Sequence, residues 1–172
     1  MLAIRIRWIA RREQQRWSRR GMPLPTELLA LIAQGRWPIG EKGVYNLRPL
    51  VKGESAKRVF RITDELHFSN APLATVAEAD EREVRVYGGS SFWKSEWAAP
   101  AELDWARAID IGDLGIGSDS PIVLDYRDCP PQPSVRYLRV TWLSETERVF
   151  ENHWEKVADS FGDFLRMLDV KV

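Results

Sequence analysis

Cysteine and histidine are scarce in this sequence, and it contains no long apolar run. The chain of 172 residues has one cysteine, Cys129, and two histidines, His67 and His153. One cysteine excludes an intramolecular disulfide and any zinc or iron–sulfur site that needs several thiolates. No apolar run approaches the roughly 20 residues that cross a bilayer. Arg5 and Arg7 interrupt the N-terminal apolar stretch before it reaches the length of a signal-peptide core. We therefore expect a cytoplasmic protein without a membrane partner.

The residue patterns of metal and cofactor sites are missing as well. His67 and His153 have no partner at metal-ligand spacing. Asp110, Asp113 and Asp119 do not follow the one-three-five order that wraps calcium, so turn capping explains them better. We expect no metal, no cofactor and no catalytic residue. In the enzymatic alternative, these three aspartates would coordinate a metal or a substrate.

The glycine-rich segment in this region does not form a nucleotide-binding motif. Gly112, Gly115 and Gly117 give G-x-x-G-x-G, which is not the order of a dinucleotide-binding turn. We expect a turn in which all three glycines adopt positive φ. Ser118 lacks the second glycine of a nucleophile elbow. Cys129 lies among prolines, and we expect an idle thiol there rather than a nucleophile.

Charge is distributed unevenly along a chain whose formal net charge is zero. Residues 62–128 contain fourteen acidic and five basic residues, a net charge of −9. Such a segment forms either a solvated acidic face or a surface that steers a basic partner towards the protein. Asp113, Asp119 and Asp128 are the acids of this segment that we consider for partner contact.

The first 20 residues, by contrast, hold seven arginines and one acid. This is the composition of a nucleic-acid arm or of a membrane-surface helix. An ordinary helix that packs Trp8 and Trp17 inward and solvates its arginines explains the same residues. We favour that interpretation, because the acidic remainder of the chain would repel phosphates. Docking of the basic helix on the acidic segment is a further alternative.

Helices are predicted at both ends of the chain, with strands between them. Pro25 and Thr26 begin a helix that Gly35 ends, and Ser160 with Asp163 forms a capping-box pattern before a helical apolar repeat. Residues 38–57 are predicted as a loop and 100–108 as a short helix. Strands are predicted at 58–62, 83–87, 109–111, 122–126, 135–142, 148–150 and 154–158. The pattern indicates one α+β domain over residues 1–172, with a central, mostly antiparallel sheet flanked by N-terminal and C-terminal helices.

Aromatic residues cluster after the glycine-rich hinge at 88–91. Phe92, Trp93 and Trp97 fall within six residues of one another. Most of the eight tryptophans of the chain should be core residues. An exposed tryptophan beside acidic residues would instead be a strong interface anchor, so Trp93 and Trp97 are candidate contact residues.

The segment from Ile111 to Arg127 resembles the central signature of the SUKH superfamily, the Smi/Knr cell-wall-regulator-like proteins. It reads Ile-Gly-Asp-Leu-Gly, then Gly-Ser-Asp, then Pro-Ile-Val-Leu-Asp-Tyr-Arg. Leu24–Pro25, Val135–Arg139 and the stretch from Trp154 to Leu168 resemble further parts of the family pattern. The resemblance extends over residues 24–168, and the arginine-rich residues 1–20 have no counterpart in it.

The resemblance implies an α+β fold with a mostly antiparallel sheet, no catalytic residues and a role in binding other proteins. Many bacterial members are immunity proteins, which bind and neutralise a cognate toxin that is often a nuclease. We therefore expect an immunity protein that covers a toxin domain by stoichiometric binding and does not contact nucleic acid directly. The alternative is a constitutive interaction or scaffold module of a regulatory or cell-surface assembly.

The resemblance and the charge pattern together divide the notable residues into two groups. The contact candidates are Trp93, Trp97, Asp113, Asp119 and Asp128. The signature residues that we expect to be structural are Gly112, Gly115, Gly117, Asp125 and Tyr126. We expect Asp119→Lys combined with Asp128→Lys to slow association with the partner without unfolding the domain.

Overall fold

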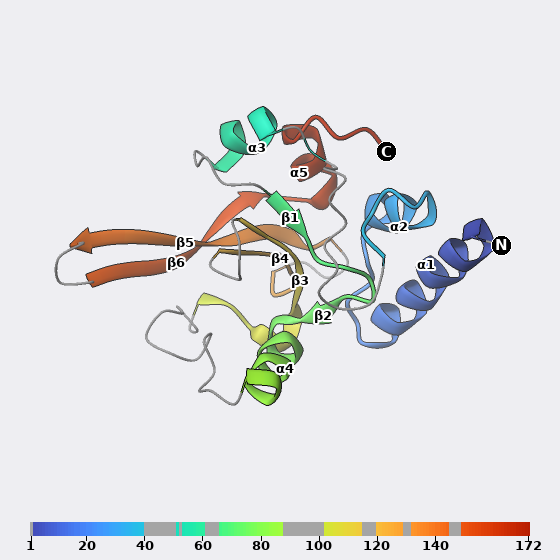
Figure 1. The fold of residues 1–172 in the computed structure, drawn as a ribbon, viewed down its shortest axis with the longest axis horizontal. Helices are drawn as coiled ribbons and strands as arrows, with labels where there is room; N and C mark the ends of the chain where they lie inside the picture. The colour runs from blue at the N-terminus through green and yellow to red at the C-terminus, as the bar shows by residue number, and fades with distance from the viewer. Residues whose placement is uncertain are drawn as a thin grey trace.

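A computed structural model of the protein describes residues 2–39, 51, 53–60, 66–87, 102–114, 120–128, 132–144 and 149–172. Within these ranges, helices pack around one open sheet (Figure 1). The helices are α1 (Leu2–Arg19), α2 (Thr26–Ala33), α3 (Gly53–Phe60), α4 (Val76–Tyr87) and α5 (Phe161–Met167), with a 3₁₀ turn, η2, at Trp105–Arg107. The strands are β1 (Leu66–Phe68), β2 (Ala74–Thr75), β3 (Ala108–Leu114), β4 (Pro121–Asp125), β5 (Ser134–Ser144) and β6 (Val149–Ala158).

The sheet has six strands in the order β1-β3-β4-β5-β6, and the short β2 also pairs with β3. Every pairing between these described strands is antiparallel. β5 and β6 pair from Val135 opposite Ala158 to Ser144 opposite Val149, and their hairpin projects beyond the other strands (Figure 1). The predicted α+β architecture, with a mostly antiparallel sheet and helices at both ends, is confirmed.

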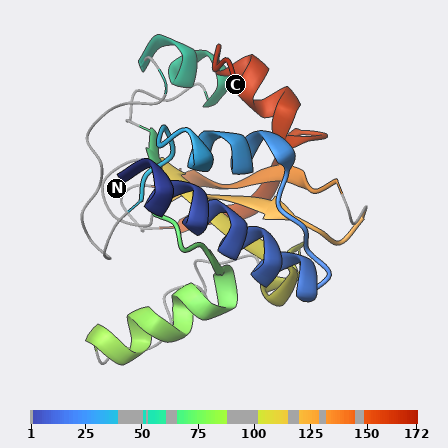
Figure 2. The ribbon, with the colours of Figure 1, turned by 90° about the vertical axis from the view of Figure 1, so that its right-hand side faces the viewer.

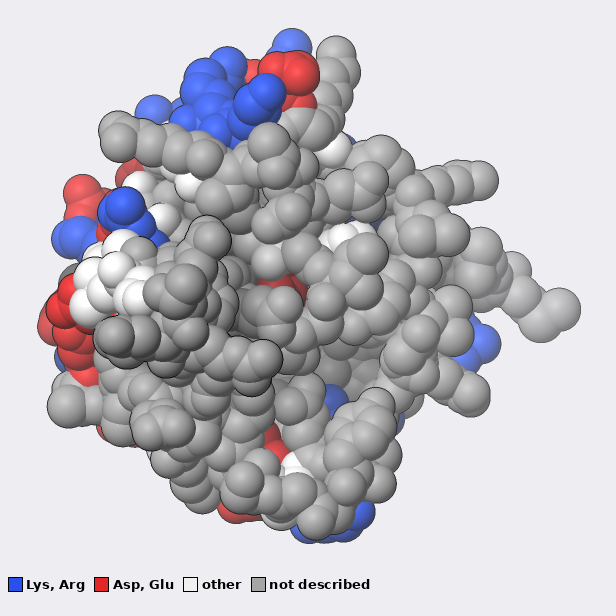
Figure 3. Space-filling model, turned by 60° about the vertical axis from the view of Figure 1, so that its left-hand side comes forward, with Lys and Arg blue, Asp and Glu red and all other residues white. Residues whose placement is uncertain are grey.

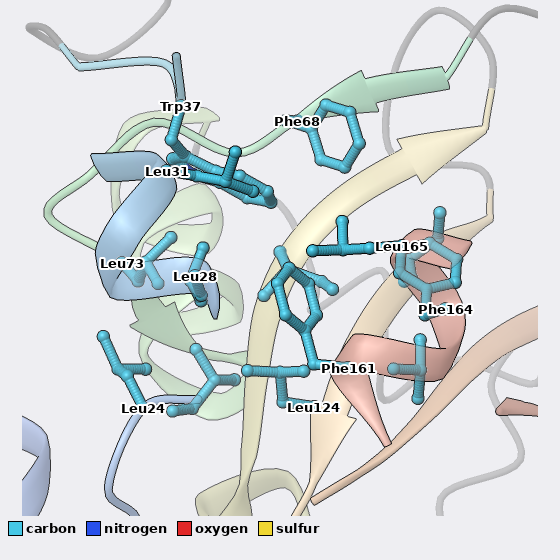
Figure 4. Close-up of a cluster of buried hydrophobic side chains, with 14 of the residues drawn as sticks. Leu24, Leu28, Leu31, Trp37, Phe68, Leu73, Leu124, Phe161, Phe164 and Leu165 are labelled. Carbon is cyan, nitrogen blue, oxygen red and sulfur yellow. The ribbon is translucent and has the colours of Figure 1, made fainter. Parts of the chain in front are cut away.

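Both faces of the sheet are covered, because side chains alternate along the central strands. Ile122 and Leu124 of β4 point into the larger core, whereas Val123 between them points to the opposite face. The larger core contains side chains of α2 and α5, including Leu28 and Phe161, and Figure 4 shows them facing each other beside β4. On the opposite face, a smaller cluster joins the start of α4 to β4, β5 and β6.

The two terminal helices are attached to the core in different ways. α5 packs directly into it, with Phe161, Phe164 and Leu165 fully or almost fully buried. α1 runs beside α2 on the outside of the molecule, on the side that faces the viewer in Figure 2. Trp17, near the end of α1, is fully buried, so the C-terminal half of α1 is anchored in the core.

Both punctuated helices form as predicted. α2 spans Thr26–Ala33, and Gly35 follows it with a φ of +68°, the left-handed conformation that ends a helix at low cost when the residue is glycine. At the start of α5, the Ser160 hydroxyl accepts a hydrogen bond from the Asp163 N–H at 3.1 Å. The strands predicted within 109–142 correspond to β3, β4 and β5, whereas the two C-terminal strand pieces are parts of the single strand β6.

The prediction of a strand at 83–87 is wrong, because these residues belong to α4. The reason lies at the start of the helix, where Thr75 and Glu78 form a capping box. The Thr75 hydroxyl accepts from the Glu78 N–H at 3.1 Å, and the Glu78 carboxylate accepts from the Thr75 N–H at 2.9 Å. Two backbone N–H donors at the helix start thereby have acceptors. This stabilisation of the helix outweighs the strand preference that the alternation of apolar and charged residues indicated.

The strand predicted at 58–62 and the loop predicted at 38–57 are also wrong in part. Residues 53–60 form α3, in which Ala56 and Phe60 are buried one turn apart while Lys57 and Arg58 are exposed. That spacing is helical, since residues four apart share one face. Of the helix predicted at 100–108, the described part shows only η2 at 105–107, and β3 begins at Ala108. Residues 61–62 and 100–101 lie outside the described ranges.

Candidate functional site

Gly112 lies where strands β1 and β3 approach each other closely. Its φ is outside the left-handed region, so the expected positive φ is wrong at this position. A Cβ at Gly112 would lie 2.4 Å from the backbone oxygen of His67. Glycine is therefore required here by close backbone contact rather than by an unusual backbone conformation. Gly115 and Gly117 lie outside the described residues.

Asp125 is the buried acid of the signature-like segment, and two arginines surround it. Its side chain is fully buried. Arg127 donates to both carboxylate oxygens, from Nη2 to Oδ2 at 2.8 Å and from Nε to Oδ1 at 3.1 Å. Arg136 Nε lies 2.8 Å from Oδ2 as an ion pair, without the alignment of a hydrogen bond. The hydrogen bond to Asp125 is also the largest cause of the raised pKa of the Arg127 guanidinium.

Tyr126 connects the same segment to the N-terminal part of the chain. Its hydroxyl donates a hydrogen bond to the Pro23 carbonyl at 2.8 Å, just before α2 begins. Burial raises the pKa of the Tyr126 phenol above its ordinary value, so it stays protonated and remains a donor. Asp125 and Tyr126 therefore hold the sheet and the N-terminal segment together, in agreement with the structural role expected for them.

Asp113 and Asp128, the two contact candidates that the structure describes, are far apart. Asp113 is half-buried on β3, where it accepts from the Ser120 N–H at 3.3 Å. Asp128 follows β4, with a side chain that is 72% exposed and lies 3.8 Å from Arg136 Nη2. Asp113 pairs with Pro121 at one end of the β3–β4 pair, and Ala108 pairs with Asp125 at the other. At about 3.3 Å per residue, the two ends are about 17 Å apart. One compact site does not contain both aspartates.

Asp128 has an acidic neighbour that the sequence did not single out for partner contact. Asp104 precedes η2, caps it by accepting from the Ala106 N–H at 3.1 Å, and is exposed. The Tyr126 N–H donates to the Arg107 carbonyl at 3.1 Å, so the segment that carries Asp104 lies beside the segment that carries Asp128, and both acids raise the pKa of Arg127. We name Asp104 and Asp128 the β4-end acids. The antiparallel pairing of β3 with β4 brings the segments that carry these two residues to the same end of the sheet, and nothing in their sequence spacing indicated it.

The remaining contact candidates, Trp93, Trp97 and Asp119, lie outside the described residues. The acidic segment they belong to is less acidic at its surface than its sequence indicates. Asp80 and Asp125 are buried, and Glu78 is paired with Arg16 of α1 and with Arg20, which directly follows α1. On the face shown in Figure 3, described basic side chains gather at the top and acidic side chains lie along the left margin. The described part of that face therefore carries both signs of charge.

The arginine-rich helix α1 is docked on the acidic segment, as one of the alternatives for it predicted. Arg20 Nη1 lies 2.8 Å from one oxygen of Glu78, and Arg16 Nη2 lies 3.4 Å from the other. Burial opposes ionisation of Glu78, but the Thr75 N–H and the charges of Arg20 and Arg16 outweigh it and lower its pKa. α1 is thus joined electrostatically to the start of α4.

The expectation that α1 packs both of its tryptophans inward is only half right. Trp17 is fully buried, and its indole N–H donates to the buried Glu13 at 3.1 Å. The same carboxylate oxygen, Glu13 Oε2, also accepts from the Leu73 N–H at 3.0 Å, so this carboxylate fixes α1 to the chain before β2. Trp8 is 56% exposed instead. At about 100° per residue, the offset of nine positions between Trp17 and Trp8 places Trp8 about 180° from Trp17, on the opposite side of the helix and away from the core.

Among the described residues, no group of three or more His, Cys, Asp and Glu side chains is arranged to hold a metal ion. Asp110, one of the three aspartates considered for that role, accepts from the Ser69 hydroxyl at 3.0 Å and from the Gly112 N–H at 3.1 Å. Asp110 therefore stabilises the junction between β1 and β3. None of the described helices is long and apolar enough to span a membrane.

Comparisons with known proteins identify no relative of this chain. The chain matches no protein-family model, no curated protein and no solved structure.

Proposed function

We propose that this protein is an immunity protein of the SUKH type, which neutralises a cognate bacterial toxin in the cytoplasm by stoichiometric binding. The observation that carries the proposal is the use made of the signature-like residues. Asp125 is enclosed by Arg127 and Arg136, and Tyr126 is bonded to Pro23. The ionisable side chains of this segment thus maintain the fold. We infer that a partner binds to the exposed surface around them.

The β4-end acids supply a surface suited to a basic partner. Asp128 extends into solvent at the end of the central strand β4, and the exposed Asp104 lies near the same guanidinium of Arg127. Exposed carboxylates accelerate encounter with a basic surface and fix its register. Trp93 and Trp97 remain the proposed apolar anchors, and Asp113 and Asp119 the further acidic contacts. The toxin is neutralised because its active surface is covered.

The proposal is tested by co-expressing the chain with the product of the adjacent upstream gene and purifying the two together. A one-to-one complex, and survival of cells in which the neighbouring gene is induced, are the expected results. Recovery of a complex without any effect on survival would favour a constitutive scaffold module. Absence of a complex, when the chain itself is folded, would contradict the proposal.

A further inference from the structure

The outward side of α1 is a second charged surface, opposite in sign to the β4-end acids. Ala10, Glu13 and Trp17 point inward and are buried. The residues on the other side are all exposed, and we name them the α1 outer face: Ile4, Arg5, Arg7, Trp8, Arg11, Arg12 and Arg19. Helix α1 has 18 residues and is therefore about 27 Å long. Figure 2 shows α1 on the outside of the molecule, beside α2.

The arginines of this face are not used inside the molecule. Arg16 and Arg20, which pair with Glu78, lie outside it. For Arg5, Arg7, Arg11 and Arg19, the described part of the chain offers no ion pair, and Arg12 contacts only the ring of Trp8, at 5.2 Å from its centroid. The sole acid of the helix, Glu13, points inward. The face therefore presents five guanidinium groups and no compensating carboxylate.

Two large apolar side chains lie within this basic face. Ile4 is 76% exposed and Trp8 is 56% exposed, and they are four residues apart, one above the other on the helix. Their exposed position has no role in the fold, because the same helix is anchored by Trp17 and Glu13 further along. Apolar residues at this spacing are the anchors that a helix inserts into a groove of a partner. Tryptophan and arginine are also the residues most enriched at energetically dominant contacts.

The charge distribution of the whole chain favours an acidic protein over a nucleic acid as the partner of this face. Residues 1–20 carry a net charge of +6, and the chain is neutral, so the rest of it carries −6. Duplex DNA has one charge per about 1.7 Å and extends past a helix of this length, so it would meet that negative remainder. An acidic patch on a protein can place carboxylates opposite the arginines without extending along the negatively charged remainder of the chain. Arginine, whose planar guanidinium binds carboxylates in a bidentate manner, is the only basic residue type in the face.

We propose that the α1 outer face is a docking surface for an acidic protein, in which Ile4 and Trp8 fill an apolar groove and the arginines pair with carboxylates around it. The surface is independent of the β4-end acids, which are suited to a basic partner. A variant at either surface should therefore leave binding at the other unchanged.

The test places a photoreactive p-benzoylphenylalanine at residue 4 of the full-length chain and irradiates cells that express it. We expect one protein to be crosslinked through a segment rich in Asp and Glu. Arg12→Glu should reduce its yield at least about tenfold, and Trp8→Ala should reduce it to a similar extent. Replacing one of the crosslinked carboxylates by arginine should restore the yield with Arg12→Glu. The same probe at Leu143, which is 61% exposed on the β5–β6 hairpin, is the control.

Matched variants separate this docking surface from general effects of charge. Lys57→Glu makes the same change of charge on the exposed surface of α3 and should leave the crosslink unchanged. Asp128→Lys should also leave it unchanged, so the proposed immunity function and this proposal can fail separately. No crosslinked protein, or a yield that Arg12→Glu does not alter, would overturn the proposal. So would binding of an RNA of about 20 nucleotides, or of vesicles with about 30% phosphatidylserine, if Trp8→Ala and Arg12→Glu abolish it.

Discussion

At Asp125, one carboxylate without solvent contact is balanced by two arginines whose side chains are 28% and 19% exposed. Removing such a carboxylate leaves two guanidinium groups close together without their counter-charge. Loss of one partner of a buried ion pair costs about 3–5 kcal/mol. Because Arg127 and Arg136 retain some access to water, we expect Asp125→Ala to lower the free energy of unfolding by about 3 kcal/mol, measured by urea denaturation.

Asp159→Ala provides the control for that measurement. Asp159 pairs with Lys156 at 2.6 Å, but its side chain is 83% exposed. Ion pairs in water contribute little, so we expect no measurable change in stability. Equal effects of the two substitutions would show that the Asp125 network does not hold the sheet.

The buried phenol of Tyr126 should make the stability of the protein depend on pH in the alkaline range. Burial raises its pKa above the ordinary value of 10.0, so the folded protein retains the phenolic proton where the unfolded chain has released it. Stability from this group is complete below about pH 10 and falls as the pH rises further, by at most about 1.4 kcal/mol per pH unit. We expect Tyr126→Phe to lose about 1 kcal/mol at neutral pH with its bond to Pro23, and to show a shallower decline above pH 10. Urea denaturation at about pH 8 and about pH 11 measures both effects. Parallel declines in the two proteins would contradict the assignment.

The tryptophans show which single residues could be placed from the sequence. Helical periodicity correctly placed Trp17 with the core, because several buried residues share its side of α1. It did not place Trp8, since an exposed tryptophan is costly and is not expected unless a partner covers it. The structural role of Asp125 was expected from the family resemblance, whereas its arginine partners come from two parts of the chain: Arg127 lies just after β4, and Arg136 belongs to β5. Sequence patterns report one element at a time, and these contacts join several.

At the scale of elements, the contact between α1 and α4 depends on Glu78. This residue closes the capping box with Thr75 and binds Arg16 and Arg20. Its pKa is lowered, so the stability it provides is present above about pH 4.5 and is lost as the pH falls through the folded value. Its side chain is 37% exposed, which limits the effect. We expect Glu78→Gln to lower the free energy of unfolding by at most about 1 kcal/mol at neutral pH. At about pH 3 the difference in this free energy between the variant and the wild type should be smaller, because Glu78 of the wild type is then largely protonated.

Glu81→Gln, at an exposed position on the same helix, is the comparison for Glu78→Gln, with both variants followed by urea denaturation across the acid range. Loss of stability with Glu81→Gln to the same extent would indicate a general charge effect rather than a specific contact.

The same helix shows why strands and helices were confused. The apolar–charged alternation at residues 83–87 predicted a strand, although the Thr-x-x-Glu capping box that begins at Thr75 was readable in the sequence. The strands β3 to β5 were placed correctly, because proline or glycine residues lie next to their apolar runs. The continuity of β6 was missed and two short strands were predicted in its place, because the middle of β6 is polar where the hairpin projects beyond the core.

At the scale of the whole molecule, charge rather than shape distinguishes the two proposed binding surfaces. The β4-end acids should steer a basic partner. We expect Asp128→Lys to lower the association rate constant with that partner about tenfold at low salt, with a much smaller difference at high salt. Stopped-flow measurements at several salt concentrations test this, with Glu151→Lys as the control for the same change of charge on the β5–β6 hairpin. Equal rates for wild type and Asp128→Lys at low salt would remove Asp128 from the interface.

The central claim is that the protein acts by covering a partner and not by chemical change. The most direct measurement titrates the purified chain into the active product of the neighbouring gene and follows the remaining activity. Our account predicts a linear loss of activity that ends at one equivalent and does not deepen with time. Complete inactivation by a small fraction of an equivalent, growing with time, would reveal turnover and contradict the account, as would undiminished activity at every ratio.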